Sequence, residues 1–254
     1  MTLPRTPSFR LDGRRALVTG GTRGIGFGAA VALAEAGAAV TIAARTAADV
    51  SAVVNAMADA GLDVEGVALD VTDRAAVESF VADVAPFEVL VNSAGMARHS
   101  SFQDISALHY QQVMDLNLSA TLFVSQAVVN RLRAAGLPGS IIHVSSQMGH
   151  VSGPNRALYS ASKFAVEGLS KAMAIELGPH DIRVNTICPT FIETELTAKS
   201  LSDPAFKSWV LSKIKLGRLG RVEDIMGPVV FLASDAAALI TGTSLMVDGG
   251  WTAE

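Results

Sequence analysis

Short apolar runs alternate with longer alanine-rich stretches along the chain, and this alternation limits the fold more than any other feature. Because the runs are continuously apolar rather than alternating with polar residues, a sheet built from them must be covered on both faces. The stretches between them have helical character. The sequence therefore predicts a doubly wound α/β (Rossmann) fold, a parallel sheet with helices on both faces. The expected strands are residues 14–20, 38–45, 63–71, 87–95, 139–146, 181–189 and 243–250.

The expected helices have recognisable ends. The stretches 24–37 and 46–61 both finish on glycine, the residue that favours a helix C-terminus. Asp73, with Thr72, offers an N-cap for 74–84. Two further helical regions are expected at 104–135 and 157–178.

No repeat or Pro/Ser-rich linker divides the 254 residues, so a single domain, 1–254, is expected. One segment departs from the alternation of strands and helices. Residues 190–217 carry charges, Pro204 and Trp209 between the sixth strand and a helix. We expect this insertion to be a substrate loop or lid, and the alternative is a surface helical hairpin.

Composition excludes several classes of protein. With 50% hydrophobic and 17% charged residues, the chain can bury a large core and is not disordered. A net charge of -4 gives no basic surface for nucleic acid, and no apolar run is long enough to predict a membrane partner. The lone Cys188 excludes a disulfide framework and, without a His/Cys cluster in the sequence, argues against a structural zinc site. It indicates a reducing compartment, most simply the cytoplasm, and the N-terminus lacks the apolar core of a signal peptide. Histidines with ligand spacing are absent, so no metal is expected.

A glycine-rich turn, residues 19–26 (TGGTRGIG), joins the first strand to the first helix. Glycines let the backbone approach a pyrophosphate, which then lies on the helix N-terminus. A glycine-rich turn can also simply close a strand and open a helix, but this position favours a dinucleotide site. The residues expected to bind the cofactor here are Gly20, Thr22, Arg23, Gly24, Ile25 and Gly26.

Other cofactor contacts are expected where further strands end. The second strand ends in Ala44-Arg45, without the acidic residue that binds the ribose of NAD. Arg45 and Arg23 suit the 2′-phosphate instead, so NADP(H) is favoured and NAD(H) stays possible. Asp70 could accept a hydrogen bond from the adenine amino group. The remaining contacts expected at strand ends are Val71, Asn92, Ala94 and Gly95.

Tyr159 and Lys163 are four residues apart in a helical stretch, so they share one face. A tyrosine pKa near ~10 is too high for a general base at neutral pH, and a neighbouring ammonium would lower it. Ser146, at the end of the fifth strand, could hold a substrate oxygen. Each of these residues is ordinary alone, but together they favour proton transfer beside a nucleotide.

Taken together, these motifs resemble those of the short-chain dehydrogenase/reductase family, from Leu11 to Gly250. The resemblance rests on the T-G-x-x-x-G-I-G loop, the N-x-A-G segment and the Ser/Tyr-x-x-x-Lys set. It implies a seven-stranded sheet and usually a homotetramer.

The resemblance also implies roles for single residues. Tyr159 would be the general acid/base, and Lys163 would lower its pKa and hold the nicotinamide ribose. Ser146, rather than the competing Ser145, would orient the substrate, and Asn117 would hold a water in a proton relay. Contacts to the nicotinamide carboxamide are implied for the segment containing Pro189, Ile192 and Thr194. Ser93 and Thr190 depart from the family pattern, and Thr190 lacks the freedom of glycine at positive φ.

The substrate is expected to be a small ketone or secondary alcohol. Polar loop residues favour a hydroxylated substrate, and three segments resemble those of gluconate 5-dehydrogenase-type sugar-acid reductases. Arg98 would then hold the carboxylate, although it could equally be a solvated rim residue, like His99. Alternatives are a 3-oxoacyl thioester reductase of the acyl-carrier-protein type and a non-catalytic nucleotide-binding protein. The candidate residues lining the substrate site are Arg98, His99, Gln147, His150, Asn155 and Trp209.

Overall fold

The computed structural model describes residues 2–254, with the side chains of 196 and 199 left aside. One parallel sheet contains seven strands in the order β3-β2-β1-β4-β5-β6-β7, which confirms the predicted fold. The order reverses beside β1, because β2 pairs with one of its edges and β4 with the other. The strands are β1 (Arg15–Thr19), β2 (Ala39–Ala44), β3 (Val64–Ala68), β4 (Val89–Asn92), β5 (Gly139–Val144), β6 (Ile182–Pro189) and β7 (Ser244–Val247).

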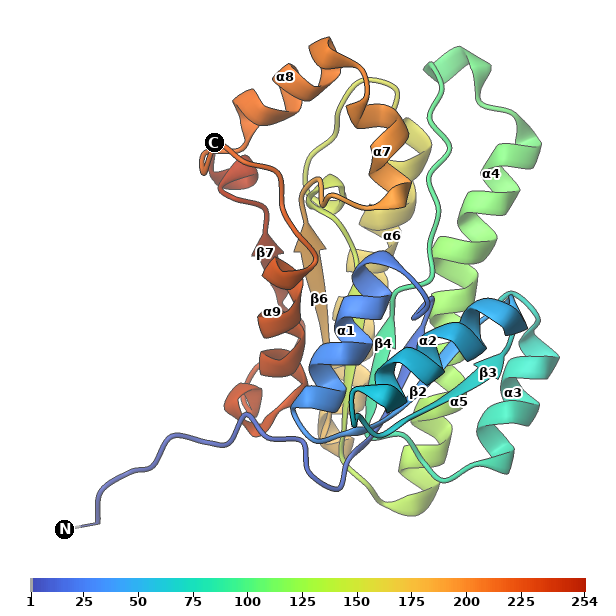
Figure 1. Ribbon diagram of the computed structural model, residues 1–254, viewed down its shortest axis with the longest axis vertical. Coiled ribbons are helices and arrows are strands. Elements are labelled where there is room, and N and C mark those ends of the chain that lie inside the picture. The colour runs from blue at the N-terminus through green and yellow to red at the C-terminus, as the bar shows by residue number, and fades with distance from the viewer. Residues whose placement is uncertain (1) are drawn as a thin grey trace.

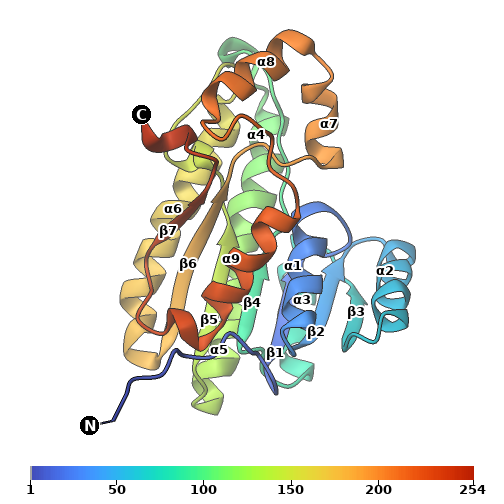
Figure 2. The same cartoon turned by 60° about the vertical axis from the view of Figure 1, so that its left-hand side comes forward.

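Helices cover both faces of the sheet (Figures 1 and 2). One core contains residues of α1, α2 and α9, and the opposite core contains residues of α3, α5 and α6. Neighbouring strand residues supply different cores: Val18 of β1 packs in the first and Leu17 in the second. The helices are α1 (Gly24–Glu35), α2 (Ala47–Asp59), α3 (Arg74–Asp83), α4 (Ala107–Met114), α5 (Ala120–Ala135), α6 (Ala157–Leu177), α7 (Glu195–Leu201), α8 (Pro204–Lys213) and α9 (Glu223–Ala233).

Local sequence signals explain several helix boundaries. The Asp73 carboxylate accepts a hydrogen bond from the Ala76 N–H, so Asp73 is the predicted N-cap of α3. The region expected to be one helix over 104–135 is instead interrupted. A π-helical turn, Asp115–Ser119, separates α4 from α5. Such turns insert an extra residue into a helix and are frequent at functional sites.

The segment 190–217 folds into α7 and α8, which lie beyond the carboxyl ends of the strands (Figure 1). A third, smaller apolar cluster packs this segment onto the rest of the protein. Within it, the Trp209 ring meets the Trp251 ring edge-on at 5.4 Å. None of the helices in residues 2–254 is both long and apolar enough to cross a membrane.

Candidate active site

The glycine-rich turn is as tight as predicted, and glycine is required at two of its positions. Gly20 has a φ of +67°, and a Cβ there would lie 2.9 Å from the Ala94 backbone. A Cβ on Gly26 would lie 2.3 Å from the Gly20 carbonyl oxygen. Side chains at these positions would push apart the turn, the start of α1 and the segment after β4.

The N-terminus of α1 is suited to an anion. The helix has no acidic residue in its first turn, and no side chain caps it. Its first N–H groups therefore have no intrahelical partner, which is the arrangement that binds pyrophosphate. Thr22 and Ile25 are half-buried at this turn. A Cβ on Gly24 would lie 3.4 Å from the methyl group of Thr194. The chain's own residues thus fit a dinucleotide.

The groups expected around the adenosine lie at the ends of β2 and β3. Arg23 and Arg45 are both exposed, and Arg23 makes a 3.5 Å ion pair with Glu195 of α7. The Asp70 carboxylate accepts hydrogen bonds from the Thr72 N–H and hydroxyl at 2.9 and 2.7 Å. These bonds, with a smaller contribution from the Arg45 charge, lower the Asp70 pKa. Val71, which follows Asp70, is buried.

The end of β4 is held against the glycine turn. The Thr19 hydroxyl accepts hydrogen bonds from the N–H groups of Ser93 and Ala94, at 3.2 and 3.3 Å. The Asn92 amide donates to Ser125 at 2.9 Å. A Cβ on Gly95 would lie 3.9 Å from Lys163 Nζ, so the segment after β4 reaches α6.

Ser146 is buried and its hydroxyl is fixed in direction. The hydroxyl donates to Gln147 Oε1 at 2.7 Å and accepts from the Met148 N–H at 3.1 Å. Ser146 also acts to lower the pKa of the Tyr159 phenol, against the larger effect of burial. Ser145, the competing serine, is buried beside Glu167 and Cys188 instead. The structure therefore places Ser146, and not Ser145, in the cavity that Tyr159 also lines.

Lys163 is buried on α6, and its ammonium is held at the end of β5. Its ammonium donates to the Val144 carbonyl oxygen at 2.8 Å and lies 5.7 Å from the centre of the Tyr159 ring. Burial lowers the Lys163 pKa to about 8. Burial also raises the Tyr159 pKa, and it outweighs the opposing effects of Ser146 and Arg156. The net direction of the Tyr159 pKa is therefore upward, and its lowering by Lys163 stays a prediction.

Asn117 lies in the π-helical turn, and its amide is fully engaged. Asn117 Oδ1 accepts from the Met96 N–H at 2.9 Å, and Nδ2 donates to the Met96 carbonyl oxygen at 2.9 Å. Nδ2 also donates to Ser162 of α6 at 3.0 Å. Asn117 thereby ties the segment after β4 to the helix that carries Tyr159 and Lys163.

A solvent-open cavity of about 460 Å³ adjoins Ser146 and Tyr159. None of the described side chains that line it is acidic. The lining residues are Ala97, His99, Ser146, Gln147, Met148, Arg156, Tyr159, Thr190, Phe191, Thr197 and Ser200.

Of the six candidate lining residues, His99 and Gln147 line this cavity. Arg98 and Asn155 are exposed and do not line it, and Asn155 has a φ of +59° in the turn before α6. Trp209 packs against the aromatic rings of Phe206 and Trp251. The His150 ring points away from the cavity, toward Glu167 and Cys188. The directions of these side chains depend on loop paths that residue type does not specify.

Arg156 is a cavity residue that sequence reasoning missed. It is only 7% exposed, although it precedes α6 directly, and its guanidinium lies 5.1 Å from the centre of the Phe206 ring. Burial lowers the Arg156 pKa. Among the described side chains, no carboxylate forms an ion pair with it. The site thus presents an unpaired buried cation beside Tyr159.

The nicotinamide-side segment also differs from expectation in one detail. Thr190, where the family pattern has glycine, does not have a positive φ, so glycine's freedom is not needed there. Its N–H donates to the Val247 carbonyl oxygen at 3.2 Å, and its buried hydroxyl has no partner in the described part of the chain. Pro189 and Ile192 are buried nearby, and Thr194 caps α7.

Comparison with known proteins assigns the family. A family model described as enoyl-(acyl carrier protein) reductase matches residues 20–252. Together with the fold and the Ser146/Tyr159/Lys163 set, the comparisons show that the chain belongs to the short-chain dehydrogenase/reductase family, and it is an oxidoreductase of that type.

Its similarity to particular relatives extends over nearly the whole chain. It is 43% identical to D-erythrulose reductase of Gallus gallus, over 96% of this chain and 98% of that one. It is 40% identical to L-xylulose reductase of Bos taurus, over 96% and 99%. A gluconate 5-dehydrogenase from Burkholderia cenocepacia, solved with NADP and tartrate, superposes with a TM-score of 0.92 at 37% identity, over 97% and 98%.

Proposed function

We propose that this oxidoreductase uses NADP(H) to interconvert a ketone and a secondary alcohol on a small hydroxylated acid, such as a sugar acid. The observation that carries the proposal is the cavity shared by Ser146, Tyr159 and Arg156. The first two residues can act on a carbonyl group, and the third can hold an anionic group a few ångströms away. The relatives' names support small hydroxylated substrates.

In the reductive direction, the Tyr159 phenol donates its proton to the carbonyl oxygen as that oxygen becomes a hydroxyl. The high Tyr159 pKa keeps the phenol protonated, so that it acts as the acid. Ser146 is held by Gln147 and Met148 so that its oxygen stays beside Tyr159. A bound NADPH supplies the hydride.

Lys163 and Asn117 support this proton transfer without lining the substrate cavity. The buried Lys163 ammonium stabilises the phenolate that remains after the proton has left. Asn117 holds Met96 and Ser162, and so fixes the distance between the cofactor-side segment and α6. The resemblance to the family also implies that an asparagine at this position holds a water of a proton relay, and we propose that role for Asn117.

For the cofactor, we propose NADP(H) over NAD(H). Arg23 and Arg45 flank the place of the adenosine ribose, and the end of β2 has no carboxylate to repel a 2′-phosphate. Asp70 stays charged because Thr72 stabilises its carboxylate, so it is available as a hydrogen-bond acceptor for the adenine amino group.

Arg156 supports an acidic substrate over a neutral ketose. Burying an unpaired guanidinium is costly, and a bound carboxylate would offset that cost with a bidentate, charge-assisted pair. Gln147 and the unpartnered Thr190 hydroxyl supply neutral hydrogen bonds for substrate hydroxyl groups or the nicotinamide carboxamide. Arg98, the anchor expected from sequence, is exposed and does not line the cavity.

We also propose that residues 190–217 form a lid. Phe191, Thr197 and Ser200 line the cavity from this segment, and the Arg23–Glu195 ion pair links it to the cofactor turn.

A homotetramer is proposed as well, because large apolar side chains are exposed on α4 and α6, which contact each other. They are Leu108, Tyr110, Phe164 and Ile175. Sedimentation velocity measures the number of chains in the assembly. We also propose that the protein is located in the cytoplasm.

A coupled absorbance screen tests the function. The purified chain is assayed with NADPH or NADH against keto-acid sugars, neutral ketoses and 3-oxoacyl thioesters. We expect the highest kcat/KM with NADPH and a keto-acid sugar. Preference for a neutral ketose would contradict the acidic substrate, preference for a thioester would favour the acyl-carrier alternative, and no turnover would favour a nucleotide-binding role.

A further inference from the structure

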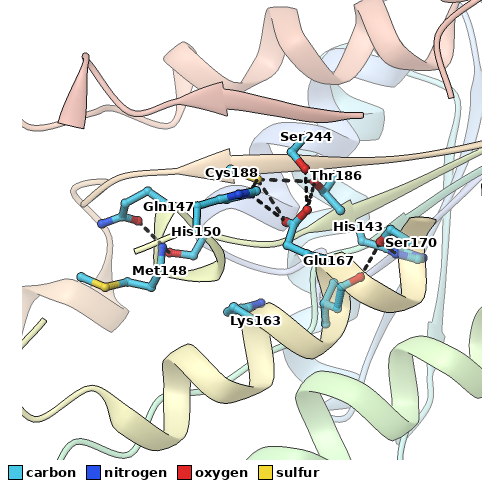
Figure 3. Close-up of polar contacts among 12 residues, drawn as sticks. His143, Gln147, Met148, His150, Lys163, Glu167, Ser170, Thr186, Cys188 and Ser244 are labelled. Atoms are coloured by element: carbon cyan, nitrogen blue, oxygen red, sulfur yellow. Dashed lines mark hydrogen bonds and ion pairs between the residues drawn. The ribbon is translucent and has the colours of Figure 1, made fainter. Parts of the chain in front are cut away.

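Three chemically different side chains converge behind the catalytic serine, outside the cavity. His150 follows the turn Gln147–Gly149, Glu167 lies on α6 and Cys188 lies on β6. Cys188 Sγ is 3.5 Å from His150 Nε2 and 3.2 Å from Glu167 Oε1, and the nitrogen is 3.6 Å from that oxygen. Figure 3 shows the three groups pointing toward one another. They were not apparent from sequence because they come from three separate elements.

Two of these separations, 3.5 and 3.6 Å, are those of ligands around one metal ion, and the third, 3.2 Å, is the shorter distance of a thiol donating to a carboxylate. Tetrahedral Zn²⁺ has bonds of about 2.3 Å to sulfur and about 2.0–2.2 Å to nitrogen and oxygen, which puts its donor atoms roughly 3.3–3.7 Å apart. A thiol, an imidazole and a carboxylate form a mixed set that suits Zn²⁺ and not Ca²⁺ or Mg²⁺, which require oxygen ligands.

The carboxylate is oriented as a metal ligand would be. Glu167 Oε2 accepts hydrogen bonds from Thr186 Oγ1 at 3.0 Å and Ser244 Oγ at 2.6 Å. These two hydroxyls hold the side chain so that the other oxygen, Oε1, faces His150 and Cys188 (Figure 3). Second-layer hydrogen bonds of this kind fix ligands in protein metal sites.

Charge and an unused hydroxyl point to the same place. Glu167 is 5% exposed, and among the described side chains it forms no ion pair with a lysine or arginine. The nearby Lys163 ammonium instead donates to Val144. Ser145 Oγ is buried beside Glu167 and Cys188 and has no hydrogen bond of normal geometry within residues 2–254. A cation would compensate the carboxylate, and Ser145 Oγ or a water could complete its coordination.

We propose that His150, Glu167 and Cys188 form a binding site for Zn²⁺ or a similar transition-metal ion. In the metal-free arrangement, the Cys188 thiol donates to Glu167 Oε1. Metal binding replaces that proton and releases it to solvent. His150 is 27% exposed and gives the ion a route from solvent. The bound ion ties residues 147–150, which directly follow Ser146, to β6 and α6.

Cobalt(II) is the probe, because a thiolate ligand gives it a charge-transfer absorption that carboxylate and imidazole ligands do not. The full-length protein is stripped with a chelator and titrated with Co²⁺, then with Zn²⁺. The variants are Cys188→Ser and His150→Gln, and the control is His180→Gln at an exposed position outside the cluster. Circular dichroism and an NADPH fluorescence titration check that each variant is folded.

We expect about one Co²⁺ per chain with a thiolate charge-transfer band, and displacement by Zn²⁺. Cys188→Ser should abolish the band, His150→Gln should weaken Co²⁺ binding at least tenfold, and His180→Gln should change neither. If Cys188→Ser fails to fold, the Co²⁺ affinity of His150→Gln alone tests the proposal, because the His150 side chain is partly exposed. The proposal is overturned if the wild-type protein gives no band at stoichiometric Co²⁺, or if binding is unchanged in His150→Gln. Those results would leave the three side chains as a hydrogen-bonded cluster only.

Discussion

Arg156 and Tyr159 lie one helical turn apart at the start of α6 and border the same cavity. The phenol is the proton donor of the proposed reaction, and the guanidinium is a buried cation without a carboxylate partner among the described side chains. The guanidinium also lies over the Phe206 ring of α8. One helix start thus joins the reacting group, the proposed anion contact and the proposed lid.

Replacing this cation should distinguish acidic from neutral substrates. Arg156→Ala should raise KM for a keto-acid sugar about tenfold to a hundredfold, because a charge-assisted hydrogen bond contributes about 1.5–3 kcal/mol. KM for a neutral ketose should change little. Steady-state kinetics with both substrates measures the difference.

Arg98→Ala is the matched control, since Arg98 is exposed and does not line the cavity. It should leave both KM values unchanged. If Arg98→Ala raises KM for the acid and Arg156→Ala does not, the carboxylate contact belongs to the residue expected from sequence.

The two arginines beside the adenosine site should set the cofactor preference. Arg45→Ala should raise KM for NADPH about tenfold and leave KM for NADH within twofold, because only NADPH carries the 2′-phosphate. Initial rates with each cofactor provide the measurement, and Arg133→Ala, at the exposed end of α5, is the control. An equal effect on both cofactors would assign Arg45 to another role.

The sequence predicted the sheet well, because continuously apolar strands can be buried on both faces in only a few ways. It also singled out Ser146 and Tyr159, which line one cavity in the structure, because a strand end and a helix start define their positions. It did not predict the π-helical turn around Asn117, because the side-chain hydrogen bonds of Asn117 are made with the backbone of Met96, 21 residues away. Arg156 looked like an ordinary arginine before a helix. Its burial depends on α8, which packs over it.

The buried ammonium should limit activity at alkaline pH. Lys163 has a pKa of about 8, so it loses its charge above that pH and no longer stabilises the phenolate. We expect reductive kcat/KM to fall above about pH 8. Tyr159 cannot cause this decline, because its pKa is raised above the ordinary 10.0. A flat profile from pH 7 to 10 would show that Lys163 keeps its proton.

A second buried group should affect stability in acid. His143 has a pKa lowered to about 4 by burial, against 6.5 in the unfolded chain. Between these values the unfolded state binds the extra proton, so stability falls as pH falls. From pH 6.5 to 5.5, the wild-type protein should lose about 1 kcal/mol more than His143→Gln. Urea unfolding at fixed protein concentration measures it, and equal losses would mean that His143 does not titrate in this range.

The central claim is that Tyr159 supplies the proton, and Tyr159→Phe tests it most directly. The substitution removes only the hydroxyl, so NADPH binding, followed by fluorescence titration, should stay within about twofold. The account predicts that kcat for the best substrate in the screen falls at least about a hundredfold, the usual contribution of a general acid. A kcat within tenfold of wild type, with NADPH binding intact, would contradict it.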